Sequence, residues 1–213
     1  MAAPYIVTNV VLEVEASRDT AITVTAVTNA NPGVATAPTH GLTDGDYVIL
    51  VVSSGMTQLN GQVCRVAGSD TNTFQLEGVD TTNYGTWDSG TCEEILTWST
   101  YCNATAINLG GGGATEVDTS NFCSLQQEVG YGLAPPLSGT IEAQHAPFNA
   151  AQAKFKAARQ SDNLAVRFTR NDSSIAAYGV GTSFSGGSNA ALNAVETTSI
   201  PITVRGTIVN YAS

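Results

Sequence analysis

The sequence predicts a mainly β protein of the sandwich or barrel type, with one short α-helix and a small all-β inserted domain. Charged residues make up only 12 % of the 213 residues, against roughly 25 % in ordinary soluble domains. Thr, Ser, Asn and Gly supply the polar surface instead, and these residues suit strands and turns better than long amphipathic helices. Short β-branched runs alternate with Asn-Pro-Gly, Asp-Gly-Asp and Leu-Asn-Gly turns, which is typical of compact β folds.

The first predicted element is a strand over residues 5–15, YIVTNVVLEVE, which is β-branched and partly alternating. Its end is expected to expose Glu13 and Glu15. One face of this strand is expected to carry Ile6, Thr8, Val10, Leu12 and Val14.

Residues 19–94 change to short strands that are closely punctuated by turn residues. Charge changes with them: residues 1–95 hold eleven acids and two bases, whereas residues 96–213 hold seven acids and six bases. We therefore expect two modules, a discontinuous main domain over residues 1–18 and 95–213 and an inserted small β domain over residues 19–94.

The main domain resumes with a loosely alternating stretch over residues 95–107, followed by the glycine run at 110–113. No GK[ST] motif or helix follows these glycines, so a loop or hairpin tip is favoured over a phosphate-binding loop. A hairpin is predicted next, each strand with one core face and one polar, mildly acidic face. Its polar positions are Phe122, Ser124, Gln126 and Glu128 on the first strand, opposite Cys123, Leu125 and Val129, and Thr140, Glu142 and Gln144 on the second, opposite Ile141 and Ala143.

A helix is predicted over residues 149–160, NAAQAKFKAARQ, because Asn149 is a good N-cap and the basic residues lie in its C-terminal half. Phe148 and Phe155 are expected to hold it against the sheet. Three strands follow, over residues 164–170, 174–186 and 197–211. In the last strand, Ile200, Ile202, Val204 and Ile208 share one face, Thr203, Arg205 and Thr207 share the other, and Pro201 indicates an edge or a bulge.

No catalytic, cofactor or metal site is expected. The two histidines, His40 in a turn and His145 at a strand end, have no partners at ligand spacing, so turn or surface histidines are favoured. Asp44 and Asp46 flank a turn glycine without the further ligands that calcium needs. The four cysteines, Cys64, Cys92, Cys102 and Cys123, form no CxxC pair, which favours buried free thiols, with Cys92–Cys102 as the alternative disulfide.

The net charge of −10 argues against binding nucleic acid through its phosphates, which requires a Lys/Arg surface. No apolar run reaches the roughly 18 residues needed to cross a bilayer, so no membrane segment is expected. The first residues, MAAPYIVTNVVLEVE, show neither the basic nor the apolar region of a signal peptide. A polar-faced β chain of this kind is suited to function by assembly, in which strands of neighbouring copies complete a sheet.

The second part of the chain resembles the major tail tube protein of long-tailed, siphovirus-like bacteriophages. The resemblance is carried by an ordered series that includes NFCSLQQEVGYGLAPPLSGTIEAQHAPF, NAAQAKFKAARQ, LAVRFTR and the final stretch AAYGVGTSFSGGSNAALNAVETTSIPITVRGTIVNY. With the N-terminal strand, it covers about two thirds of the chain. It implies a β-sandwich or barrel tail-tube fold and a structural virion protein, with no enzymatic activity and no cofactor.

The resemblance further implies homohexameric rings that stack into a tube, a channel through which double-stranded DNA passes without specific binding during genome ejection. The candidates for its polar, acidic lining are Gln126, Glu128, Thr140, Glu142 and Gln144. Arg167 and Arg205 lie on polar strand faces and are candidates for inter-subunit ion pairs, with ordinary solvated arginines as the alternative. The candidates for ring-to-ring contacts are the N-terminal residues and Gly110, Gly111, Gly112 and Gly113. The implied partners are other copies of the chain, the tape measure, the terminator and the baseplate or tip, in a virion tail assembled in the host cytoplasm.

Residues 19–94 resemble a small β module that recurs in phage tail proteins and the little β domain of ubiquitin-activating enzymes. The resemblance rests on TNANPGVATAPTHGLTDGDYVIL, SGMTQLNGQVCRVAG and TNTFQLEGVDTTNYG. It implies a decoration or interaction module on the outside of the tube. The alternative function is a tail-fibre, decoration or adhesin-like β protein that binds a host or capsid surface.

Overall fold

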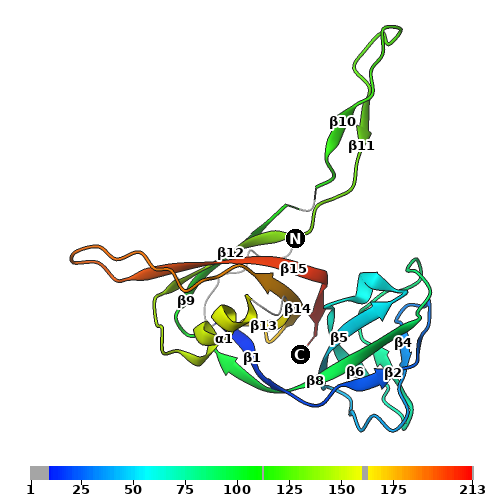
Figure 1. Ribbon diagram of the computed structural model, residues 1–213, viewed down its shortest axis with the longest axis horizontal. Coiled ribbons are helices and arrows are strands. Elements are labelled where there is room, and N and C mark those ends of the chain that lie inside the picture. Colours follow the sequence, from blue (N-terminus) through cyan, green and yellow to red (C-terminus); the bar gives the residue numbers. More distant parts are fainter. Residues whose placement is uncertain (1–9, 112, 160–162, 213) are drawn as a thin grey trace.

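The computed structural model describes residues 10–111, 113–159 and 163–212, and it confirms the mainly β fold class. Figure 1 shows a main body that holds helix α1, a second body built from β2 to β7 with part of β8, and an arm that projects from the main body. Twelve strands follow one another in a single sheet in the order β3-β4-β7-β6-β5-β8-β1-β13-β14-β15-β12-β9, and β2 joins it beside β8. The expected strand residues 5–9 and the helix residue 160 lie outside the described residues.

The main body is an antiparallel sheet that curls around the helix (Figure 1). Strands such as β12 form from alternating segments because one face can be buried while the other stays polar. Strand β14 is buried along both faces, because its residues contribute to both cores. The strands are β1 (Val11–Arg18), β8 (Ser89–Thr100), β9 (Ala104–Gly110), β12 (Ser138–Gln144), β13 (Leu164–Thr169), β14 (Ile175–Thr182) and β15 (Thr197–Tyr211).

Helix α1 (Ala150–Ala158) begins where the sequence predicts, because the Asn149 side chain accepts hydrogen bonds from the backbone N–H groups of Ala151 and Gln152. Phe155 is fully buried against Ile141 and Ile200, in the core that the helix closes over the sheet. The expectation that Phe148 holds the helix against the sheet is wrong, because its side chain is fully exposed.

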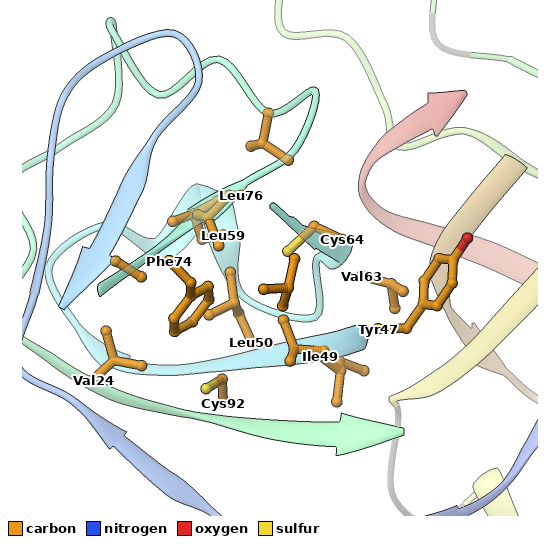
Figure 2. Close-up of a cluster of buried hydrophobic side chains, with 14 of the residues drawn as sticks. Val24, Tyr47, Ile49, Leu50, Leu59, Val63, Cys64, Phe74, Leu76 and Cys92 are labelled. Carbon is orange, nitrogen blue, oxygen red and sulfur yellow. The ribbon is translucent and has the colours of Figure 1, made fainter. Parts of the chain in front are cut away.

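The second body holds its own core (Figure 2), with Phe74, Leu50 and Cys64 among the buried side chains. Its strands are short, as the frequent turn residues predict, and a 3-10 helix (Thr57–Leu59) joins β5 to β6. The strands are β2 (Ile22–Val24), β3 (Ala26–Val27), β4 (Val34–Thr36), β5 (Tyr47–Ser54), β6 (Val63–Ala67) and β7 (Thr73–Leu76).

The two bodies are joined by strand β8 and by side chains of the main sheet that pack in the second core. Strand β8 pairs with β5 over its first part and with β1 over its second part, so residues 94 and 95 lie within one continuous strand. The second core also contains Ala177, Val209 and Tyr211 from the main sheet. The Gln62 amide bonds the backbone of Thr207 through both of its polar atoms, at 3.0 and 2.7 Å. The division of the chain into domains at 18/19 and 94/95 therefore stays a prediction, while the structure shows one sheet running through both bodies.

Two strand predictions are wrong in informative ways. Glu15 is 7 % exposed and not a surface residue, because Arg18 bonds its carboxylate at 2.7 Å and the backbone N–H of Ala165 donates to it. Residues 121–128 form turns rather than a strand. The real hairpin pairs β10 (Glu116–Asp118) with β11 (Val129–Tyr131), while β12 pairs with β9 and β15.

All four cysteines are free, but only Cys64 and Cys92 are buried, whereas Cys102 and Cys123 are exposed. A Cys92–Cys102 bridge is excluded by geometry. Cys92 lies in β8 and Cys102 lies two residues past its end, and an extended strand separates such positions by roughly 3.3 Å per residue, far beyond the reach of a disulfide.

Candidate assembly and channel surfaces

The strands β15, β12 and β9 present a polar face on the side of the sheet opposite helix α1. In register, Thr140 lies between Pro201 and Asn108, and Glu142 lies between Ser199 and Ala106. The intervening residues Ile141, Ala143, Ile200 and Ile202 point to the helix-covered core. The alternation predicted for β12 and the first part of β15 is therefore confirmed, and Thr140, Glu142 and Gln144 share one face.

Glu142 is the only charged residue of β9 and β12, and its neighbours hold it in place. The Ser199 hydroxyl donates to its carboxylate at 2.7 Å, and the Thr105 hydroxyl donates to its backbone carbonyl at 3.1 Å. The carboxylate is thus fixed on a surface formed mainly by hydroxyl and amide groups. On this face β9 and β12 offer no cation to a phosphate, and their hydroxyl and amide groups bind water readily. Arg205 of β15 lies farther along, where the second body meets β14.

Strand β9 ends the sheet on this side, among the residues that the structure describes. Its partner β12 occupies one side, so its other side leaves a row of backbone N–H and C=O groups without a strand partner. An edge of this kind is a template for pairing with a strand of another chain.

Pro201 lies at a position of β15 where its missing N–H removes no hydrogen bond from the β14–β15 ladder. The last β14–β15 pair is Thr182 with Ile202, so the proline lies one residue past that ladder, where its carbonyl accepts a hydrogen bond from the Thr182 hydroxyl. The bulge expected near it is found instead at Gly206, whose φ is +66°, where the β14–β15 register shifts.

The arm, residues 113–137, projects away from both bodies (Figure 1). Its two strands are extended by a hydrogen bond from the N–H of Gly132 to Thr115 and another from the N–H of Thr119 to Glu128. Gln126 and Glu128 lie in this arm, so the structure does not bring them onto the face that holds Thr140, Glu142 and Gln144. The arm exposes large apolar side chains, namely Val117, Phe122, Leu125, Val129, Tyr131 and Leu133.

Sequence reasoning missed this apolar arm because it assigned Phe122 and Leu125 to opposite faces of a strand. The signal that could have found it is the setting of these two residues. They lie among Asn, Ser and Gln and are flanked by a glycine run on one side and by Pro135 and Pro136 on the other, a pattern typical of an exposed loop.

A second segment, residues 183–196, leads into β15 and is mostly exposed, although Phe184 is buried. It carries the exposed side chains of Leu192 and Val195, and its base is closed by a hydrogen bond between Ser188 and Glu196. Glu196 also lies 3.8 Å from the ring of His145. Exposed large apolar side chains gathered in protruding segments are typical of surfaces that are buried on assembly.

The structure gives the predicted inter-subunit residues separate settings. Arg167 lies within the chain, with its guanidinium 2.7 Å from Glu13 and 4.6 Å from the ring centre of Trp98. Arg205 lies where the second body meets β14. Gly110, Gly111 and Gly113 lie at the base of the arm, where β9 ends, and Gly112 lies outside the described residues.

The histidines and acidic turn residues serve local structure. His40 is buried rather than a surface residue: its Nδ1 accepts the N–H of Leu42 at 3.0 Å, and its ring packs edge-on against Phe74. Asp46 accepts the N–H of Thr43 and closes the predicted reversal. Within residues 10–111, 113–159 and 163–212, no group of three or more His, Cys, Asp or Glu side chains could hold a metal ion. No helix in the described part of the chain is long and apolar enough to cross a membrane.

A family model described as phage tail tube protein, TTP, matches residues 54–213. The chain belongs to the phage tail tube protein family. Tail tube proteins are structural rather than enzymatic, so the chain is a structural component of the virion tail that assembles with itself and with other tail components. No curated protein matches the chain at a significant level.

The tail tube match begins at the last residue of β5 and continues through β6 and β7. It therefore includes residues 54–94, which were predicted to belong to the inserted module, and it leaves out all of β1 as well as β2, β3, β4 and all but the last residue of β5. The structure gives a physical reason for treating these parts together, because β6 packs on β14 and the backbone N–H of Arg65 donates to the Tyr211 hydroxyl at 2.9 Å.

Proposed function

We propose that the chain forms hexameric rings, and that these rings stack into the tail tube of a long-tailed phage around a channel for DNA. The observation that carries the proposal is the polar face of β9, β12 and β15. It lies on one side of a sheet whose other side is filled by the helix-covered core, and it reaches β9, which among the described residues is paired with β12 on one side only.

Edge pairing explains how the sheets of separate copies could join into one continuous sheet around the channel. A neighbouring copy that adds a strand to β9 satisfies its outward backbone groups, and repetition around a ring leaves no β9 edge exposed. The same closure turns the polar faces of all copies toward the axis. The lining then consists of residues such as Thr140, Glu142 and Gln144.

The chemistry of this face suits passage rather than binding. DNA bound through phosphates is held by Lys and Arg, and β9 and β12 contain neither. Glu142, held by Ser199, adds one carboxylate per copy that repels the DNA backbone. Gln126 and Glu128 belong to the arm, so the lining proposed here rests on β12 and its neighbours.

The test is Glu142→Lys in assembled phage. We expect tubes to form and genome ejection to slow or stop, because the substitution places a ring of cations against the phosphates. Negative-stain microscopy checks the tubes, and release of DNA followed with an intercalating dye measures ejection. Asp88→Lys is the matched control, since it makes the same change of charge at an exposed position of the second body. Intact Glu142→Lys tubes that eject at the wild-type rate would refute the lining.

The remaining parts of the proposal concern the wider particle. We infer that the tape measure, the terminator and the baseplate or tip contact the tube, and that assembly takes place in the host cytoplasm. The second body, which packs on the sheet through β13, β14 and β15, is proposed to lie on the tube exterior.

A further inference from the structure

An uncharged groove of about 530 Å³ lies where β1 begins, β8 ends and β9 begins. Leu12 and Tyr101, which belong to the helix-covered core, form its floor, and Ile107 and Phe168 contribute partly exposed side chains. Its lining contains no Lys, Arg, Asp or Glu. An apolar groove of this kind is suited to large apolar side chains of another segment.

The arm offers such side chains. Phe122 and Leu125, at its tip, are fully exposed. The arm leaves the body beyond the Gly110 end of β9 and points away from it (Figure 1), whereas the groove lies beside the Ala104 end of the same strand. The tip of one copy therefore faces away from its own groove and is available to the groove of another copy.

Charge favours the same pairing. Residues 113–137 of the arm contain Glu116, Asp118 and Glu128 but no Lys or Arg. At the groove, the Arg170 guanidinium lies 6.0 Å from the ring centre of Phe168, which lines it. An acidic arm thus meets a groove with a cation at its border, an arrangement that steers association and favours one orientation.

We propose that the arm tip of one copy docks in this groove of a second copy, with Phe122 and Leu125 buried against Leu12, Tyr101 and Phe168. The proposal rests on the proposed self-assembly and names the surfaces through which part of it occurs. The exposed segment 183–196, with Leu192, is the competing occupant, and the test below distinguishes the two.

The chain carries its own reporters for this contact. Cys123 follows Phe122 at the arm tip, and Cys102 lines the groove. Both thiols are exposed, whereas Cys64 and Cys92 are buried. Docking brings Cys123 of one copy close to Cys102 of the next, so the contact can be tested without substituting any residue of the interface.

Assembled wild-type tubes are treated with a short bismaleimide, quenched and separated under denaturing conditions. Because each copy holds one thiol of each kind, we expect a ladder of covalent dimers, trimers and longer species. Mass spectrometry is expected to identify the Cys102–Cys123 peptide pair. Cys102→Ser and Cys123→Ser are matched controls, and each is expected to lose that pair while its tubes remain visible by microscopy.

Each outcome has a distinct meaning. Tubes that form without the Cys102–Cys123 pair, or with Cys123–Cys123 pairs only, overturn the docking and leave self-assembly standing. A wild-type preparation that forms no tubes at all overturns self-assembly together with the docking that depends on it. Leu192→Ser is expected to leave the ladder intact. Wild-type tubes that lack the Cys102–Cys123 pair, and in which Cys102 reacts with a maleimide only after Leu192→Ser, would assign the groove to the segment 183–196.

Discussion

Gly179 in β14 lies where the second body packs on the main sheet, and Gly179→Ala tests that packing. A Cβ at this position would overlap the carbonyl oxygen of Gly61, in the turn before β6, and would lie 3.1 Å from its carbonyl carbon. The backbone at Gly179 has no positive φ, so alanine is acceptable to the strand itself. Any loss of stability in Gly179→Ala therefore comes from the contact between the two bodies.

The turn that carries Gly61 has little freedom to move aside. Gln62, the next residue, is 1 % exposed and bonds Thr207 through both its amide oxygen and its amide nitrogen. Added volume in a well-packed site costs about 1–3 kcal/mol, and the restricted turn places Gly179→Ala toward the upper part of that range. The lower entropy of the unfolded alanine chain offsets about 0.4–1 kcal/mol. We expect a net loss of about 2 kcal/mol.

Urea denaturation of the unassembled protein measures this loss. With an m value of about 3 kcal/mol/M, the midpoint falls by about 0.7 M. Tryptophan fluorescence, to which Trp87 in the second core and Trp98 packed against it both contribute, and the far-UV signal should report the same shift, because the two cores share one sheet.

Gly110→Ala is the matched control, since it also lies in a strand but a Cβ there meets no atom within 4 Å. Its midpoint should equal or slightly exceed that of the wild type. If Gly179→Ala unfolds at the wild-type midpoint, the turn does not lie against β14, and the described joining of the two bodies is incorrect.

Two further predictions concern the cores. Phe155→Ala should lower the free energy of unfolding by about 3–5 kcal/mol, because it empties a fully buried site, whereas thermal melts of the exposed Phe148→Ala should match the wild type. Raising the pH above about 8.5 should destabilise the protein: burial raises the pKa of Cys92 to about 12, so the unfolded chain loses that proton first. The raised pKa of Tyr178, also about 12, acts in the same direction above pH 10. Above pH 8.5 the Cys92 thiol is then expected to lower the free energy of unfolding by about 1.4 kcal/mol for each pH unit. Urea midpoints that stay constant from pH 8 to 10 would contradict this.

Local pattern was sufficient where one element decides its own structure. Asn149 caps the first turn of α1, and the alanine-rich segment after it favours a helix, so this element follows from local sequence. The strand over residues 197–211 was predicted with its observed bounds, because its apolar positions alternate over several residues. The same alternation placed Thr140 and Glu142 on the polar face of β12.

Local pattern failed where the partner lies far along the chain. The segment at 121–128 alternates like a strand, but the neighbours of β12 are β9 and β15, so no position beside β12 remains for it. In the sequence, Glu15 has the pattern of an exposed strand end. In the structure, β13 brings the N–H of Ala165 to the Glu15 carboxylate, and β8 brings Glu93 to Arg18, which also bonds Glu15. Such long-range pairings follow from sheet order, which residue alternation does not encode.

The distribution of charge over the surfaces bears more directly on the proposed channel than the net charge of −10. Several carboxylates are paired inside the chain: Arg18 bonds Glu15 and Glu93, Arg65 bonds Glu77, and Arg167 bonds Glu13. These pairs lie away from the polar face of β9 and β12, where Glu142 is the one carboxylate. Repeated around each ring and along the tube, this single group would give a weak repulsive field at every level. The surrounding hydroxyls and amides would keep a water layer, so along β9 and β12 DNA would meet no cation that holds it.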